Sequence, residues 1–167
     1  MAKYRPDADI ASRHTAITGA ASRYGCVNEA TASDSEYVKS DDNQTDSYFH
    51  VGLPDVTDPH SHGTHTLSVR NKIESLSIKN AIAVTLKTGS TNVATWNLSK
   101  STSWATQVLT LTAANIDALI AAAYADLSVY VKFESSTFVT TDNSFVSWIE
   151  FETPDHPDTG IELGIVF

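Results

Sequence analysis

The sequence predicts an all-β protein: an antiparallel two-sheet β-sandwich of jelly-roll type with one short helix. Short segments in which apolar and polar residues alternate recur along the chain, as is typical of strands with one buried and one solvated face. Thr and Ser are abundant, which favours strands joined by hydroxyl-bearing turns. The segment 112–127 instead has a helical period, so we expect two packed sheets and a single helix.

The size and charge of the chain narrow its range of functions. Its 167 residues suit one β-sandwich domain, 1–153, followed by a linker and an apolar ending, 154–167. The net charge is −9 and the basic residues are scattered, which argues against a nucleic-acid partner. No stretch approaches the roughly 18 apolar residues of a membrane span, and the start lacks a signal-peptide pattern. The single cysteine, Cys26, suits a protein assembled inside a cell.

The strands in the first half of the chain are predicted from apolar alternation. Residues 25–30 and 36–40 are short strand candidates near the start. Residues 47–53 and 65–73 carry apolar side chains at alternate positions and are predicted as longer strands.

A hairpin is predicted in the middle of the chain. The alternating segments 78–89 and 93–99 are separated by the Gly-containing turn "KTGSTN", which favours antiparallel pairing of the two strands. Residues 103–112 form a further, less regular strand candidate.

The helix is predicted from a stripe of apolar residues with helical spacing. The stripe contains Ile116, Leu119, Ile120, Ala123, Tyr124 and Leu127. Thr112 can cap this helix, because its hydroxyl can accept from the free amides of the first turn. We expect two to three turns lying over one end of the sandwich.

The last two strands are predicted to form a second hairpin, between 127–134 and 144–152. Alternation within 144–152 places Phe145, Ile149 and Phe151 on one face, and Val146, Trp148, Glu150 and Glu152 on the other. In this arrangement Tyr130 and Trp148 face outward and lie close together across the pair. Such a pair can stack a sugar ring, or it can be covered by a partner subunit or by the N-terminal segment.

The ending "IELGIVF" is a candidate docking strand. Ile161, Leu163, Ile165 and Phe167 alternate with other residues, and a free apolar strand in solution would promote aggregation. We expect it to add to a sheet edge of a neighbouring copy or another partner. Docking on its own sandwich is the alternative.

Three histidines lie close together at His60, His62 and His65. If residues 60–62 were extended, both imidazoles would face one side and could share a metal ion. A metal site also needs three or four ligands that are held rigidly. Because Pro59 and Gly63 flank this segment, we expect a loop without metal, followed by a strand that begins near His65.

No catalytic pattern stands out in the sequence. There is no G-x-S-x-G motif, no Gly-rich phosphate loop and no recognisable partner motif for Cys26. Glu150 and Glu152, like Asp7 and Asp9, are acidic pairs, but a glycosidase also needs a cleft between its carboxylates. Solvated strand faces explain these pairs more simply, so we expect no enzyme activity and no cofactor.

Several short pieces of the chain carry a resemblance over residues 4–152. They are "YRPDADI" (4–10), "VNEAT" (27–31), "SDSEYV" (33–38), "VGLPDVTDP" (51–59), "THTLSVR" (64–70), "ATW" (94–96), "TSW" (102–104) and "LTLTAANID" (109–117). Together they resemble small β-sandwich structural proteins of tailed bacteriophages.

The resemblance implies a non-enzymatic virion protein, above all a capsid decoration (cement) protein that stabilises the head. Its expected partners are the major capsid protein or other virion proteins and further copies of itself, after assembly in the host cytoplasm. A carbohydrate-binding or host-adhesion module on the virion surface, with a surface glycan as ligand, is the alternative. A small glycan-active enzyme is a further, weaker alternative.

Overall fold

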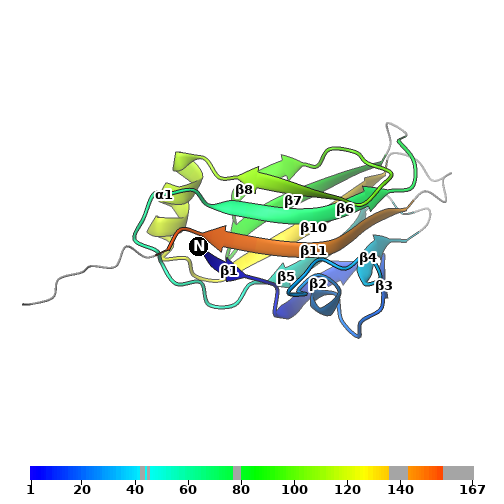
Figure 1. The fold of residues 1–167 in the computed structure, drawn as a ribbon, viewed down its shortest axis with the longest axis horizontal. Coiled ribbons are helices and arrows are strands. Elements are labelled where there is room, and N and C mark those ends of the chain that lie inside the picture. The colour runs from blue at the N-terminus through cyan, green and yellow to red at the C-terminus, as the bar shows by residue number, and fades with distance from the viewer. Residues whose placement is uncertain (42–43, 45, 77–79, 136–142, 156–167) are drawn as a thin grey trace, which may run out of the picture.

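The computed structural model describes residues 1–41, 44, 46–76, 80–135 and 143–155. These residues form two antiparallel sheets packed face to face, with one α-helix at one end of the sandwich (Figure 1). The predicted fold class is therefore confirmed. The predicted docking strand, with Ile161, Leu163, Ile165 and Phe167, lies outside the described residues.

The two sheets are built from strands that are far apart in the sequence. Sheet A has the order β3 (Thr15–Thr18), β4 (Tyr37–Ser40), β11 (Ser144–Thr153), β6 (Thr66–Ile73) and β9 (Ala105–Thr110), and β1 (Ala2–Tyr4) also pairs with β11. Sheet B has the order β2 (Ala8–Arg13), β5 (Asp46–Gly52), β10 (Leu127–Ser135), β7 (Asn80–Thr88) and β8 (Thr91–Asn97).

The pairing of eight of these strands is nested. β4 pairs with β11, β5 with β10, β6 with β9, and β7 with β8. Successive pairs alternate between the two sheets, which is the strand order of a jelly roll. The hairpin predicted between 78–89 and 93–99 corresponds to β7 and β8 and is confirmed.

The hairpin predicted for the last two strands is wrong. β10 lies in sheet B between β5 and β7, whereas β11 lies in sheet A beside β6. Apolar alternation identified both strands correctly, but it carries no information about which strand lies next to which. In a jelly roll the chain crosses from one sheet to the other at this point, so neighbours in sequence are not neighbours in a sheet.

A β-bulge in β11 changes which side chains face the core. The register against β6 shifts between Val146 and Trp148, so the alternation is interrupted there. Val146 consequently belongs to the buried core, and Phe145 lies outside it, against Tyr37. The predicted placement of Phe145 and Val146 is thus reversed, while Ile149 and Phe151 are buried as predicted.

The core between the sheets consists of the inward side chains of both. Phe49 and Phe133, on adjacent strands of sheet B, have ring centroids 5.9 Å apart and are almost fully buried. Phe151 and Ile149 of sheet A are fully buried opposite them. Their burial is a main driving force for folding.

The helix α1 (Ala113–Ala121) begins where the sequence predicts. The Thr112 hydroxyl accepts from the Asn115 amide, and the Asn115 side chain accepts from the Thr112 amide, which together form a capping box. Ile116 and Leu119 are buried under the helix. It lies across one end of the sandwich, as predicted (Figure 1).

The N-terminal part of the chain differs most from the prediction. Residues 36–40 contain β4 as expected, but the candidate strand 25–30 instead starts with the 3₁₀-helix η1 (Tyr24–Cys26). Cys26 is fully buried there, and burial raises the pKa of its thiol. The sequence did not predict β1, β2 or β3, because these strands are short or fully exposed and lack clear alternation.

Candidate ligand-binding surfaces

A cluster of three rings lies on the outer face of sheet B. Tyr48 and Tyr130 have centroids 5.1 Å apart at 33°, and His50 meets Tyr130 edge-on at 5.8 Å and 76°. Each ring is half-buried. The strand register brings them together, because Tyr130 lies opposite His50 and Lys132 lies opposite Tyr48. We call Tyr48, His50 and Tyr130 the aromatic platform.

Polar groups surround the aromatic platform. The Ser128 hydroxyl lies 2.9 Å from His50 Nε2, and the Lys87 ammonium lies 5.9 Å from the Tyr130 ring centroid. Thr85, directly opposite Tyr130, shares a 3.0 Å hydrogen bond with Thr95 on the edge strand. The face therefore combines apolar ring surface with donors and acceptors held on a rigid sheet.

Two rings of the platform, His50 and Tyr130, have shifted pKa values. Burial, helped by the Lys87 cation, lowers the pKa of His50, and burial raises the pKa of Tyr130. Both shifts favour the neutral ring. Contacts made by these side chains are therefore those of neutral aromatic groups.

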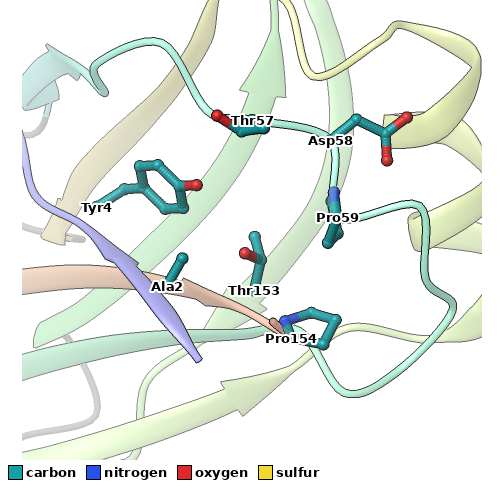
Figure 2. A pocket seen from close by; sticks show the side chains of 7 residues that line it. All are labelled: Ala2, Tyr4, Thr57, Asp58, Pro59, Thr153 and Pro154. Carbon is teal, nitrogen blue, oxygen red and sulfur yellow. The ribbon is translucent and has the colours of Figure 1, made fainter. Parts of the chain in front are cut away.

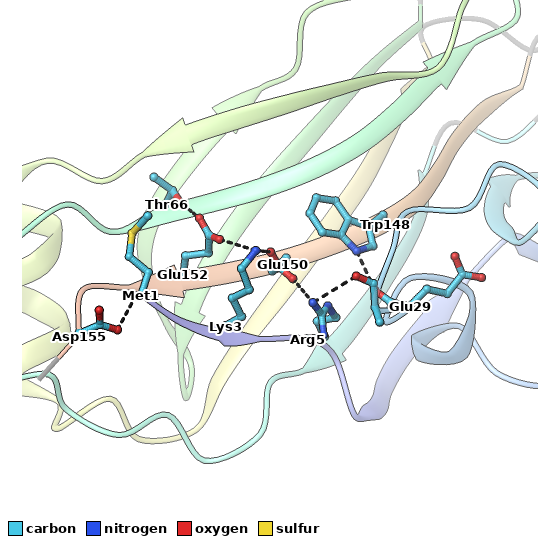
Figure 3. A network of polar contacts seen from close by, with 10 residues as sticks. Met1, Lys3, Arg5, Glu29, Thr66, Trp148, Glu150, Glu152 and Asp155 are labelled. Atoms are coloured by element: carbon cyan, nitrogen blue, oxygen red, sulfur yellow. Dashed lines mark hydrogen bonds and ion pairs between the residues drawn. The ribbon is translucent and has the colours of Figure 1, made fainter.

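Trp148 does not lie beside Tyr130, in contrast to the prediction. It faces outward from sheet A, and Figure 3 shows its indole donating to the Glu29 carbonyl, at 2.9 Å. The same loop is tied to sheet A by Arg70, whose guanidinium donates to both Asp34 oxygens at 2.6 and 2.8 Å. The loop of the chain's own residues 29–34 therefore partners Trp148.

The acidic pair on β11 forms a charged network with the N-terminal strand (Figure 3). Lys3 Nζ lies 2.7 Å from Glu150 and 2.8 Å from Glu152, and Arg5 Nη2 lies 2.5 Å from Glu150. Glu150 is only 1% exposed, so the prediction of a solvated face is wrong for this residue. The hydrogen bonds that Lys3 donates to Glu150 and Glu152 raise the pKa of Lys3, and the bond that Glu152 accepts from Lys3 lowers the pKa of Glu152. The network fastens β1 to β11.

The three clustered histidines have separate partners. His60 contacts Asp58 through its backbone amide and its ring, and His62 lies 3.1 Å from Asp117 of α1. His65 is fully buried, with its ring nitrogens 2.8 Å from the Gly63 carbonyl and 2.7 Å from the Tyr124 hydroxyl. Within the described ranges, no group of three or more His, Cys, Asp or Glu residues is placed to hold a metal ion.

A second aromatic cluster lies on the outer face of sheet A. Phe145 packs edge-on against Tyr37 at 5.3 Å and against Trp104 at 6.2 Å. The Lys72 ammonium lies 4.7 Å from the Phe145 centroid and 5.0 Å from the Trp104 centroid, a cation–π arrangement. This cluster is capped by a cation, unlike the platform on sheet B.

A pocket opens beside β1, near the N-terminus (Figure 2). Its volume is about 250 Å³. Three parts of the chain line it: β1, the loop between β5 and β6, and the end of β11. The lining residues are Ala2, Tyr4, Thr57, Asp58, Pro59, Thr153 and Pro154.

The sequence identified Tyr130 as outward-facing but missed its neighbours. The alternation that places Phe49 and Val51 in the core also places Tyr48 and His50 on the opposite face. The missing information was the pairing of β5 with β10, which joins segments nearly 80 residues apart. The pocket was not predicted, because it depends on β1.

Comparisons with known proteins give a likeness of fold. No protein-family model matches the sequence, and no curated protein matches it. A family 35 carbohydrate-binding module from Clostridium thermocellum is 14% identical, over 92% of this chain and 98% of its own, with a TM-score of 0.48.

Two further solved structures are similar at the same level. TmCBM61, in complex with β-1,4-galactotriose, is 10% identical over 90% of this chain and 88% of its own, with a TM-score of 0.46. A CBM4 structure is 20% identical over 72% of this chain and 73% of its own, with a TM-score of 0.43. Such distant likeness gives no ligand for this chain.

In the part of the chain that the structure describes, no helix is long and apolar enough to span a membrane.

Proposed function

We propose that this chain is a non-catalytic glycan-binding module and that the aromatic platform on sheet B is its binding face. The observation that carries the proposal is the contact of Tyr48, His50 and Tyr130 on one outer sheet face. Of the functions expected from the sequence, the proposal adopts the alternative, carbohydrate binding, in place of capsid decoration.

The chemistry of the platform suits a sugar ring. A pyranose has an apolar face of C–H groups that packs on an aromatic ring, and a rim of hydroxyls that need hydrogen-bond partners. Tyr130 offers a half-exposed ring, and the half-exposed Lys87, whose ammonium lies 5.9 Å from the ring centroid, can donate to a sugar hydroxyl. Because a sheet holds these groups in place, little conformational entropy is lost on binding.

A glycan array with matched variants tests the proposal. We expect the intact chain to bind a defined set of glycans, and Tyr130→Ala to weaken that binding by at least about tenfold through loss of the stacking ring. Trp104→Ala is the control, because Trp104 is a half-buried outward aromatic residue of the other sheet face. Equal losses in both variants, or no glycan bound by the intact chain, would contradict the proposal.

The capsid decoration role stays a prediction. No contact among the described residues bears on a capsid partner, a homo-oligomer or a virion location. Binding of the purified chain to undecorated bacteriophage shells, compared between wild type and Tyr130→Ala, separates that role from glycan binding. If the protein decorates capsids without using a sugar, wild type and Tyr130→Ala should bind the shells equally well.

A further inference from the structure

We propose that the pocket between β1, the β5–β6 loop and the end of β11 is a second binding site, for an uncharged polyol the size of one sugar ring. This site lies apart from the aromatic platform and does not depend on it. The proposal rests on an unpaired buried hydroxyl, on the composition of the walls and on the size of the pocket.

Thr153 supplies the unpaired hydroxyl. The residue is 1% exposed, and among the described residues its Oγ1 has no hydrogen-bond partner. Figure 2 shows its side chain in the middle of the ring of lining residues. Because a buried hydroxyl without a partner destabilises a protein, a ligand hydroxyl at this position would supply the missing bond.

The walls suit a ligand with both C–H and hydroxyl groups. Pro59, Pro154, Ala2 and the Tyr4 ring contribute apolar surface, while Thr57, Thr153 and the Tyr4 phenol contribute hydroxyls. Aromatic and apolar walls with a few polar groups are the usual lining of small-molecule sites. A cyclic polyol presents the complementary pattern of C–H faces and hydroxyl edges.

The charge of the lining residues and the volume of the pocket restrict the class of ligand further. None of the lining residues that the structure describes is a cation, so an anionic ligand would lack a counter-charge. The Asp58 carboxylate is directed away from the other lining side chains and accepts from the His60 amide at 2.7 Å. A volume of about 250 Å³ is below the roughly 300–1,000 Å³ of sites for drug-sized ligands, so it fits one ring.

The pocket is held in shape by several contacts. β1 and β11 pair from Ala2–Thr153 to Tyr4–Phe151, and the N-terminal ammonium forms an ion pair with Asp155. The β5–β6 loop packs closely against Pro154, the residue after β11, because a Cβ added at Gly63 would lie 3.2 Å from Pro154 Cβ. A preformed site of this kind loses little entropy on binding.

The experiment is an NMR titration of the full ¹⁵N-labelled chain with D-glucose, D-galactose, D-xylose and myo-inositol. Titration to roughly 50 mM covers the millimolar affinities typical of weak ligands. We expect at least one of these probes to cause saturable shifts of the Tyr4, Asp58 and Thr153 amides. Thr153→Val, which keeps the shape and removes the hydroxyl, should weaken that binding by about tenfold while the melting temperature stays equal or rises.

Three further variants make the result specific. Thr106→Val is the matched control, because Thr106 is exposed on the outer face of sheet A, and it should bind like wild type. Ala2→Leu should block binding by filling the pocket. Tyr130→Ala should leave the pocket shifts unchanged, so that failure of this site and failure of the platform are told apart.

Three outcomes would overturn the proposal. The first is no saturable shift at the pocket amides with any of the four probes, which means that the pocket holds water only. The second is unchanged affinity in Thr153→Val. The third is loss of the shifts in Tyr130→Ala, which would assign the sugar to the aromatic platform.

Discussion

His65 and Tyr124 form a buried pair whose hydrogen bonds fix one state of the imidazole. The Gly63 carbonyl can only accept, so Nδ1 carries the proton and Nε2 accepts from the Tyr124 hydroxyl. Burial lowers the pKa of His65 and raises the pKa of Tyr124 to about 12. At this scale the histidine-rich loop is a structural element, and each of its rings has a separate partner.

We predict that acid weakens the fold through His65. Because its pKa is lowered in the folded state, the unfolded chain binds the proton more readily, and stability is complete above the ordinary histidine pKa of about 6.5. The free energy of unfolding should fall as the pH drops below that value towards the lowered pKa. Urea unfolding at pH 7.5 and at lower pH measures this. His50 shifts in the same direction and adds to the fall, so His65→Asn should make the fall smaller, and the double variant His50→Ala/His65→Asn should make it smaller still.

A second prediction concerns buried Glu150. Glu150→Gln removes the charge that Arg5 and Lys3 contact, and leaves the partly buried Arg5 without its counter-ion. We expect a loss of about 2 kcal/mol in the free energy of unfolding. The control is Glu134→Gln, which breaks the exposed Lys132–Glu134 pair at 3.1 Å and should cost less than about 0.5 kcal/mol. Similar losses in the two variants would show that burial of Glu150 has no special effect.

At the scale of elements, the sequence predicts the type of most strands and the helix, but not their partners. Apolar alternation marks β5, β6, β7 and β10, because each has one face in the core. The bulge at Val146 and the separation of β10 from β11 depend on contacts between distant segments. The aromatic platform was half predicted for the same reason: Tyr130 follows from local alternation, while Tyr48 and His50 join it through the sheet.

The start of α1 gives a prediction at the same scale. Thr112→Ala removes the hydroxyl that accepts from the Asn115 amide, and should lower the free energy of unfolding by about 1 kcal/mol. Thr112→Ser keeps this acceptor and should stay close to wild type. Chemical denaturation of the three chains is the measurement. If Thr112→Ala and Thr112→Ser had the same free energy of unfolding, the capping box would not contribute to stability.

At the scale of the whole molecule, both sheets end, among the described residues, in strands that pair on one side only. Every residue of β2, an edge strand of sheet B, is exposed, and Val108 on β9, an edge strand of sheet A, is 62% exposed. Exposed strand edges can pair with an added strand. They are the places where the predicted docking strand, with Ile161, Leu163, Ile165 and Phe167, would bind on a neighbouring copy.

Deletion of residues 156–167 tests this docking. If the strand binds a neighbouring copy, the full chain should be oligomeric and the shortened chain monomeric, with the same β-sheet circular dichroism. Light scattering coupled to size exclusion measures the difference. An unchanged oligomeric state would mean that this segment does not hold copies together.

The pairing of β1 with β11 has a consequence for how the protein is made. Residues 2–4 bind to residues 151–153, and β4 binds β11 across about 100 residues of chain. Closing such long loops before native contacts form makes folding slow, on the order of milliseconds to seconds for all-β domains. A chain emerging from the ribosome cannot complete sheet A until its last strand is free. The domain is therefore expected to fold only after it has been synthesised. Until then the strands that pair with β11 have exposed edges.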